Sequence, residues 1–227
     1  MQDLQDKRSA VERLLEEFVS TADLSYRAFN IKLKVSSDPE SILGIRMPVI
    51  RKSAKRIAKL LTYDDAIDLL LDKARRHYEY KMLLGLVLQE VTATEEVPKA
   101  LSILYALCDG WATADLFKDA LGHFAQQGAL AEVEASIERY SQDVNPFARR
   151  LTIVAFLPLV KYKLVAPEVA LAHITKLQAD RDYYIEMANA WLLAELSITH
   201  PEVPHSVTSP TLLQKYRQKL RDSFRHP

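Results

Sequence analysis

The chain has 227 residues and no net charge at pH 7, so its overall charge gives no argument for binding nucleic acid or a membrane, although a local basic face is compatible with it. The composition is that of a globular protein, with 48% hydrophobic and 26% charged residues, and the five glycines are too few for a turn-rich β protein. The single cysteine, Cys108, excludes an internal disulfide and suits a reducing cytoplasm.

The first half of the chain shows the spacing of apolar residues that is typical of amphipathic helices. The first helix is marked by Val11, Leu14, Leu15, Phe18 and Val19. A shorter helix is expected over residues 21–30, followed by a loop over 31–43. Pro48 can open the next helix, which has a basic side over residues 51–59. Thr62 and Thr94 are expected to cap later helices, and a further helix is expected over about 77–90.

The second half continues this helical pattern. Trp111 opens a helix that is expected to reach about residue 126, with Gly128 as its stop. A short charged helix follows over 130–140, and Asn145 with Pro146 opens a helix through about residue 160. Further helices are expected over 167–177, from a cap at Asp180 or Asp182 to about residue 198, and over about 209–224.

These elements predict an all-α fold. About a dozen helices alternate with short loops, and no segment competes as a strand. Helix pairs recur at roughly 35–40 residues, which favours a HEAT-like helical-hairpin solenoid, an α-α superhelix with a concave face. Because no shift in composition divides the chain, we expect a single domain over residues 1–227.

Several kinds of chemistry find no motif. The histidines and the cysteine lack metal-ligand spacing, and neither a Gly-rich phosphate loop nor a Gly-x-Ser-x-Gly elbow occurs, so we expect no metal and no cofactor. Cys108 is expected to be a buried thiol. The longest apolar run, residues 151–160, is too short for a membrane span and contains Pro158, and the polar N-terminus is unlike a signal peptide. These features predict a cytoplasmic protein without a membrane partner.

Trp111 and Asp115 form the strongest functional lead. They lie one helical turn apart on one face, whereas the apolar stripe of the same helix lies about 110° away. That stripe consists of Ala114, Phe117, Leu121 and Phe124. An aromatic and an acid away from the core suggest a binding surface. The alternative is an indole packed between hairpins beside a solvated acid.

Later helices supply further candidates. Arg149 and Arg150 occupy the first turn of a helix, where a cation opposes the helix dipole, so a protein acid or a bound phosphate is expected to compensate them. Tyr183, Tyr184 and Trp191 share a mostly apolar helix, and the alternative for Trp191 is a core residue. The basic stretches at 51–59 and 215–225 suit a phosphate backbone, or are simply solvated faces.

Four segments in register resemble the DNA alkylation repair enzymes, a family of HEAT-like-repeat DNA glycosylases. They are Gly44-Ile45-Arg46-Met47-Pro48 with Arg51-Lys52, Trp111 with Asp115, Phe147-Ala148-Arg149-Arg150, and Tyr183-Tyr184 with Ala188 and Trp191. Order and spacing hold from about residue 40 to 225. Two positions depart from the pattern: Ala112 replaces an Asp of well-known active members, and Gly110 replaces an aromatic residue.

The resemblance implies roles for these residues. Trp111 and Trp191 would grip the sugar-phosphate backbone on the concave face, Asp115 would stabilise a cationic sugar and position water, and Arg150 would contact phosphate. Further contacts to DNA are expected from Arg51, Lys52, Lys118, Arg149 and Tyr184.

The predicted function is therefore hydrolysis of the N-glycosidic bond of N3- or N7-alkylated purines in double-stranded DNA, by a monomer. Such a base already carries a positive charge and leaves readily, so a carboxylate that favours an oxocarbenium-like sugar suffices. Two alternatives are a non-catalytic binder of damaged or branched DNA and a protein-binding helical scaffold.

Overall fold

The computed structural model describes the backbone of residues 2–225 and the side chains of residues 5–205 and 207–221. Over these residues the chain consists of helices and connecting loops, without a strand. The helices are α1 (Gln2–Ser20), α2 (Leu24–Leu33), α3 (Met47–Ala58), α4 (Tyr63–Arg76), α5 (Tyr78–Val91), α6 (Val97–Leu107), α7 (Trp111–Phe124), α8 (Leu130–Tyr140), α9 (Pro146–Val154), α10 (Phe156–Lys161), α11 (Pro167–Leu177), α12 (Tyr183–Thr199) and α13 (Pro210–Arg225). Short single-turn helices cover Pro39–Ser41, Thr94–Glu96 and Val203–Ser206, and a π-helical turn covers Ala125–Ala129.

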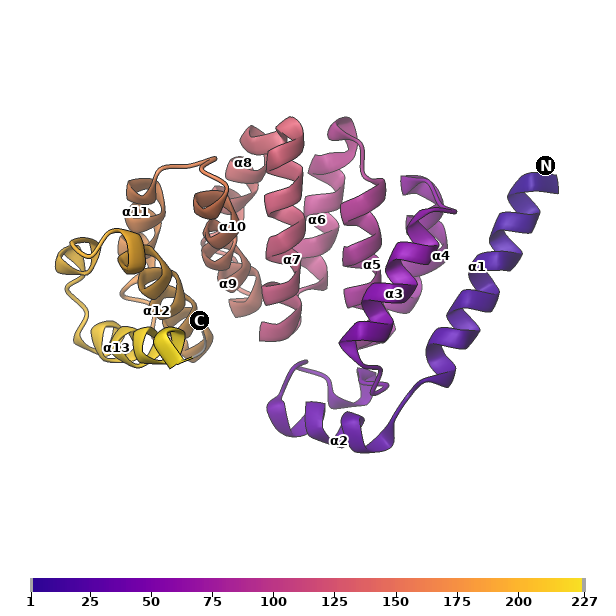
Figure 1. Ribbon diagram of the computed structural model, residues 1–227, viewed down its shortest axis with the longest axis horizontal. Helices are drawn as coiled ribbons and strands as arrows, with labels where there is room; N and C mark the ends of the chain where they lie inside the picture. Colours follow the sequence, from indigo (N-terminus) through magenta and orange to yellow (C-terminus); the bar gives the residue numbers. More distant parts are fainter. Residues whose placement is uncertain (1, 226–227) are drawn as a thin grey trace.

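The helices stack as hairpins in a curved row. α3, α5, α7, α9 and α12 pack each against the next, while α4, α6, α8 and α11 pack against this row from one side. α1 lies at one end and α13 packs on α12 at the other, as Figure 1 shows. The all-α, helical-hairpin prediction is confirmed. The assignment of the hairpins to the HEAT class in particular stays a prediction.

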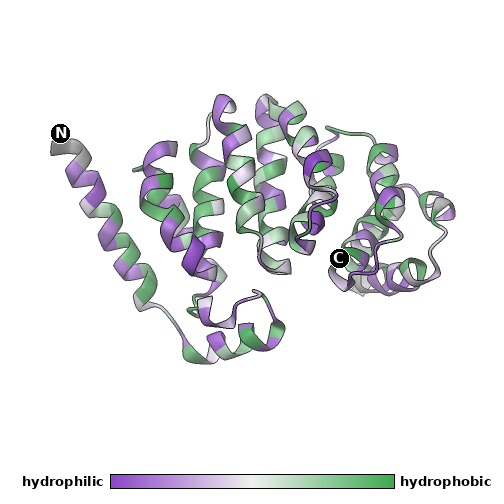
Figure 2. Cartoon of the chain, turned by 180° about the vertical axis from the view of Figure 1, so that it is seen from behind, coloured by the Kyte–Doolittle hydropathy of each residue, from purple (hydrophilic) through white to green (hydrophobic). Residues whose placement is uncertain are grey.

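One hydrophobic cluster runs through the stack, from Val11 in α1 to Leu212 in α13. In Figure 2 hydrophobic and hydrophilic residues alternate along α1, whereas the central helices are mostly hydrophobic. This continuous cluster is what a single domain would have. The single domain over residues 1–227 stays a prediction. Within the described residues, no helix is both long enough and apolar enough to cross a bilayer.

Three predicted helix starts are confirmed by their side-chain caps. Thr62 accepts the N–H of Asp65, Asn145 accepts that of Phe147, and Asp182 rather than Asp180 caps α12. The prediction for Thr94 is wrong. Residues 94–96 form a separate turn, and α6 begins at Val97 because Pro98 occupies its first turn, where a missing N–H costs nothing.

The second helix lies three residues later than expected. Asp23 accepts the N–H groups of Ser25 and Tyr26 and thereby fixes the start of α2. The helix continues to Leu33 and ends at Lys34, which has left-handed backbone angles (φ 52°). The predicted loop over 31–43 therefore begins at residue 34, and the end of α2 comes close to Trp111.

The helix expected over residues 146–160 is two helices, α9 and α10, with a break at Ala155. Pro158 has no N–H to donate to the carbonyl of Val154, so the helical hydrogen bonds are interrupted there. Pro158 instead packs on Gly122 of α7, where an added Cβ would lie 2.6 Å from the proline Cβ. The predicted stop at Gly128 is confirmed, because this glycine has φ +101° between α7 and α8.

Candidate functional site

α7 carries the candidate site on the side that faces away from its core stripe. The stripe residues Ala114, Phe117, Leu121 and Phe124 are all buried, as predicted. Trp111 and Asp115 are only partly buried. The indole Nε1–H of Trp111 donates to the carbonyl oxygen of Leu33 at 3.2 Å, so the end of α2 fixes the ring. Trp111 thus packs partly on the core while its remaining surface stays accessible.

The turn before Trp111 is held from three directions. The Asp109 carboxylate accepts hydrogen bonds from Lys81 Nζ and Ser36 Oγ, both at 2.5 Å, and Asn145 Nδ2 donates to the carbonyl of Cys108 at 2.7 Å. Gly110 lies so close to the loop after α2 that an added Cβ would be 1.9 Å from the Val35 carbonyl oxygen. A side chain at position 110 is therefore excluded by the path of residues 35–36. This close approach accounts for the glycine at the position where the pattern described above has an aromatic residue.

Asp115 forms a two-point ion pair with Arg150 of α9. Arg150 Nε lies 2.9 Å from Asp115 Oδ1, and Arg150 Nη2 lies 2.9 Å from Oδ2. Arg150 Nη1 donates to the carbonyl of Tyr184 in α12 at 2.8 Å. The arginine side chain is 8% exposed and the aspartate side chain 22%. Parallel N–H···O bonds of this kind fix the orientation of a carboxylate as well as its distance.

These residues line one open cleft of about 740 Å³. Its lining comes from α2, α7, α9, α12 and α13: Lys32, Leu33, Lys34, Trp111, Asp115, Arg150, Tyr183, Tyr184, Met187, Trp191 and Lys219. In Figure 1, α2 and α13 lie along the same edge of the stack, on either side of the ends of α7 and α9. The lining has four cationic side chains against one acidic one, so the cleft is basic although the chain is neutral.

The second indole has a hydrogen bond at its Nε1 edge and a cation over its ring. Trp191 Nε1 donates to Glu195 Oε1 at 3.3 Å, and Lys118 Nζ lies 5.9 Å from the centre of the indole ring. Lys118 also pairs with Asp119 at 2.8 Å and donates to the carbonyl of Asp115 at 3.0 Å. Trp191 is partly buried, between the core and the cleft.

The structure therefore brings the four residues with predicted catalytic roles to one place: Trp111, Asp115, Arg150 and Trp191. All four lie within residues 14–206, the range over which the chain matches a family model described as DNA alkylation repair enzyme. The chain belongs to this family. The match covers most of the chain and gives it a role in DNA repair with DNA as the partner. Comparison with curated proteins finds no match.

Of the other DNA contacts expected from the resemblance to DNA alkylation repair enzymes, Tyr184 lines the cleft. Its ring packs on Phe147 at 4.9 Å between centroids. Lys118 lies just outside, in a neighbouring groove. Arg51 and Lys52 are exposed on α3 and line neither space. Their contact with DNA stays a prediction.

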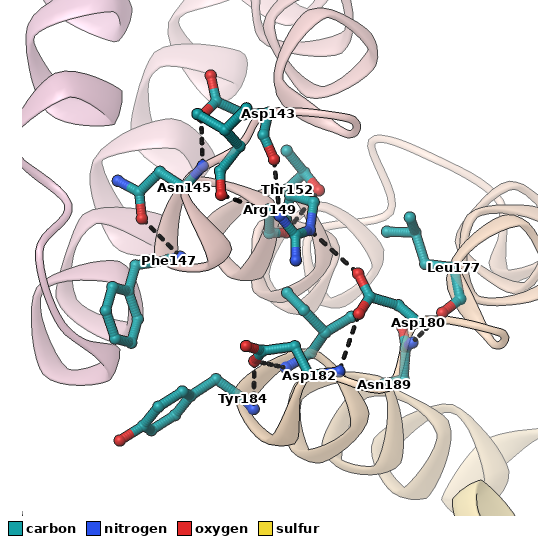
Figure 3. Close-up of polar contacts among 12 residues, drawn as sticks. Asp143, Asn145, Phe147, Arg149, Thr152, Leu177, Asp180, Asp182, Tyr184 and Asn189 are labelled. Carbon is teal, nitrogen blue, oxygen red and sulfur yellow. Dashed lines mark hydrogen bonds and ion pairs between the residues drawn. The ribbon is translucent and has the colours of Figure 1, made fainter.

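Arg149 is not part of the lining of the cleft. Its Nε lies 3.0 Å from Asp180, and its Nη1 donates to the carbonyls of Asp143 and Val144 (Figure 3). These acceptors compensate the cation at the start of α9, so the expected partner is a protein acid. In this arrangement Arg149 ties α9 to the turn before α12.

Sequence reasoning did not assign Lys32, Leu33, Lys34 and Met187 to the site. The first three fell at or beyond the predicted end of the second helix, and only the tertiary fold brings them to Trp111. Tyr183 and Lys219 carried a usable signal, because they lie in the aromatic segment and in the basic final helix that the sequence singles out.

Cys108 is buried, as predicted, and burial raises the pKa of its thiol well above the usual value, which disfavours a nucleophilic thiolate. Among the described residues, no group of three or more His, Cys, Asp and Glu side chains has the arrangement of a metal site. The polar and aromatic side chains available in the cleft are one carboxylate, one arginine, two indoles, two phenols and three lysines.

Proposed function

We propose that the chain is a monofunctional DNA glycosylase that hydrolyses the N-glycosidic bond of N3- or N7-alkylated purines in double-stranded DNA. The observation that supports it best is the Asp115 carboxylate, held by two N–H groups of Arg150 in a basic cleft that two indoles also line. The match to the DNA alkylation repair enzymes gives the DNA context. We expect the protein to act as a monomer without a cofactor.

The proposed reaction needs little from the protein. The C1′–N bond breaks and its electron pair passes to the alkylated purine, whose positive charge is neutralised. Positive charge develops on the sugar, and the Asp115 carboxylate stabilises it through space. A water molecule oriented by the same carboxylate adds its oxygen to C1′, and the released proton passes through the carboxylate to solvent.

The other residues of the cleft suit the substrate's backbone. The indole faces of Trp111 and Trp191 can pack on the deoxyribose of the damaged nucleotide, and an aromatic face also attracts a cationic base. Lys32, Lys34 and Lys219 line the cleft and would neutralise phosphates on either side. Because Arg150 uses three of its N–H groups on Asp115 and Tyr184, we assign it mainly to positioning the carboxylate.

A second candidate function is a binder of damaged or branched DNA that does not excise bases. The observation that favours it is Ala112, where well-known active relatives carry a further acid. This binder would use the same basic cleft, so only a measurement of excision separates the two functions.

The decisive experiment measures release of 3-methyladenine and 7-methylguanine from a methylated duplex. The wild type is expected to release them, and Asp115→Asn to be slower by about 100-fold or more, since a fixed charge at the reacting centre contributes on that order. Asp68→Asn is the control, because Asp68 is exposed on α4 and lies outside the cleft.

The outcomes separate the functions. A wild type that binds methylated duplex without releasing base supports the binder. Undiminished release by Asp115→Asn removes the assignment of the carboxylate, whereas loss of activity in both variants shows a general defect that is unrelated to the cleft.

A further inference from the structure

A second groove continues from the cleft along α7 and α12. It encloses about 920 Å³ and is formed mainly by α10, the loop after it and the second half of α12. Trp191 lines both spaces, so the indole forms the boundary between them. No sequence motif pointed to this groove.

The order of residues shows that the groove extends the cleft in one direction. On α7 the cleft contains Asp115 and the groove contains Lys118 and Asp119, about one turn farther on. On α12 the cleft contains Met187, and the groove reaches Thr199, about three turns farther on. A strand that lies across Trp191 therefore has an open path beside it.

The groove also has unpaired positive charge. Lys161 and Lys163 are exposed at its rim, and neither has an ion-pair partner among the described residues. Of the two acids of the groove, Asp119 pairs with Lys118 and Glu195 accepts the indole N–H of Trp191, so the three lysines of the lining outnumber its acids. The groove therefore presents free cations to a ligand, and an anionic ligand fits it.

Tyr162, between these two lysines, offers an aromatic face. Its ring lies near Gly122 of α7, where an added Cβ would be 3.6 Å from the ring edge, and the residue is still 44% exposed. Lys163 has left-handed backbone angles (φ 58°), and its N–H donates to the Val160 carbonyl at 2.9 Å, which fixes the turn that presents the tyrosine. Alternating cations and an aromatic ring suit a nucleic-acid strand.

We propose that this groove binds the continuation of the DNA strand whose damaged nucleotide lies in the cleft. Lys161 and Lys163 neutralise two phosphates beyond the lesion, and Tyr162 packs against a deoxyribose of the same strand. This inference rests on the proposed function only in placing DNA in the cleft, and it holds whether or not the protein excises the base.

The test is the salt dependence of DNA binding by Lys161→Gln/Lys163→Asn, measured by fluorescence anisotropy on a methylated duplex. Asparagine is chosen at position 163 because it tolerates positive φ. The slope of log K against log salt is negative, and loss of two phosphate contacts makes it less steep by about 1.8. The control is Lys73→Gln/Lys99→Gln, which removes two exposed lysines from α4 and α6. The control is expected to keep the wild-type slope.

The tyrosine is tested separately. Tyr162→Phe keeps the ring and is expected to bind as the wild type does, whereas Tyr162→Ser is expected to bind about fivefold more weakly or worse. Thermal melting of each variant excludes a folding defect. Equal affinity of the serine variant and the wild type for DNA overturns the proposed contact between the Tyr162 ring and the strand.

The inference and the proposed function fail in different ways. An unchanged slope in the double variant, or an equal change of slope in the control, overturns DNA binding by the groove. Base release by the wild type would leave the proposed function intact. A less steep slope in the double variant, with no base release by the wild type, supports DNA binding by the groove and overturns the proposed glycosylase activity. A wild type that binds no DNA overturns both.

Discussion

Arg150 combines burial with a geometry that lysine cannot reproduce. Three of its N–H groups reach acceptors on two other helices, the Asp115 carboxylate on α7 and the Tyr184 carbonyl on α12. The guanidinium is planar and rigid, so it can hold both acceptors at once. This contact compensates the charge of Arg150, the fifth residue of α9, near the helix start where a cation opposes the helix dipole.

We therefore expect Arg150→Lys to lower the rate of base release by about tenfold or more, because a single ammonium group loses at least one charged hydrogen bond to the carboxylate. Single-turnover release of 7-methylguanine at saturating enzyme measures the effect. Arg149→Lys is the matched control, since this neighbour also makes an ion pair, but a partly buried one with Asp180 and away from the cleft. Equal rates in the two variants would contradict a special role for Arg150.

At the residue scale, the sequence predicts well which side chains share a face of one helix. It predicts poorly which side chains of different helices come into contact. The 3.6-residue period alone places Trp111 and Asp115 together and away from the buried stripe. The convergence of Arg150 and Trp191 on them came from the resemblance, because no local pattern reports which helices become neighbours. For Arg149 the sequence predicts that an anion is needed without deciding between Asp180 and a phosphate.

Among the helices, α5 has an unusual buried acid. Glu79 is fully buried, and its carboxylate accepts the backbone N–H groups of Leu43, Gly44 and Ile45 at 2.9, 2.7 and 3.2 Å. These N–H groups belong to the loop between α2 and α3. The acid thus ties that loop, and with it the end of α2 that contacts Trp111, to the centre of the stack.

Glu79→Gln is expected to destabilise the protein by about 2–4 kcal/mol, because the amide turns a donor toward N–H groups that then lack a charged acceptor. The free energy of unfolding in urea, followed by circular dichroism, measures this loss. Glu90→Gln is the control, since Glu90 is exposed at the end of the same helix. A loss below 1 kcal/mol, by the same estimate, would show that water replaces the lost contacts.

The ends of the helices were predicted correctly where a capping side chain signals them. The predictions failed where no single side chain fixes the boundary. Thr62, Asn145 and Asp182 are correct caps because the signal is local. The shift of α2 was missed although Asp23 is a good cap, because Thr21 is an equally plausible start. The division at Ala155 was missed although Pro158 is a local signal, because the apolar pattern continues across it to residue 160.

Over the whole molecule, net charge proved a poor guide to the charge of the binding surface. The chain is neutral, yet the cleft collects four cationic side chains and one acid, and the acid is paired with Arg150. Acids elsewhere on the molecule balance the sum. Composition counts charges without locating them, so a basic binding surface on a neutral protein becomes visible only once the helices are stacked.

This distribution predicts how DNA binding responds to salt. Lys32 and Lys34 line the side of the cleft formed by α2, and both are exposed. Lys32→Gln/Lys34→Asn is expected to make the negative slope of log K against log salt less steep by about 1.8. Asparagine is chosen at position 34 because Lys34 has φ 52°. Melting temperature is expected to stay unchanged, since neither side chain contributes to the core.

The same variant also tests whether α2 guides the strand or only supports Trp111. Phosphate contacts from α2 predict weaker binding but an unchanged rate of base release once the enzyme is saturated, because Lys32 and Lys34 do not touch Asp115. A wild-type slope would place the DNA path away from α2. The role of α2 would then be the hydrogen bond from Trp111 to Leu33, and a lower rate at saturation would locate the defect in the position of that indole.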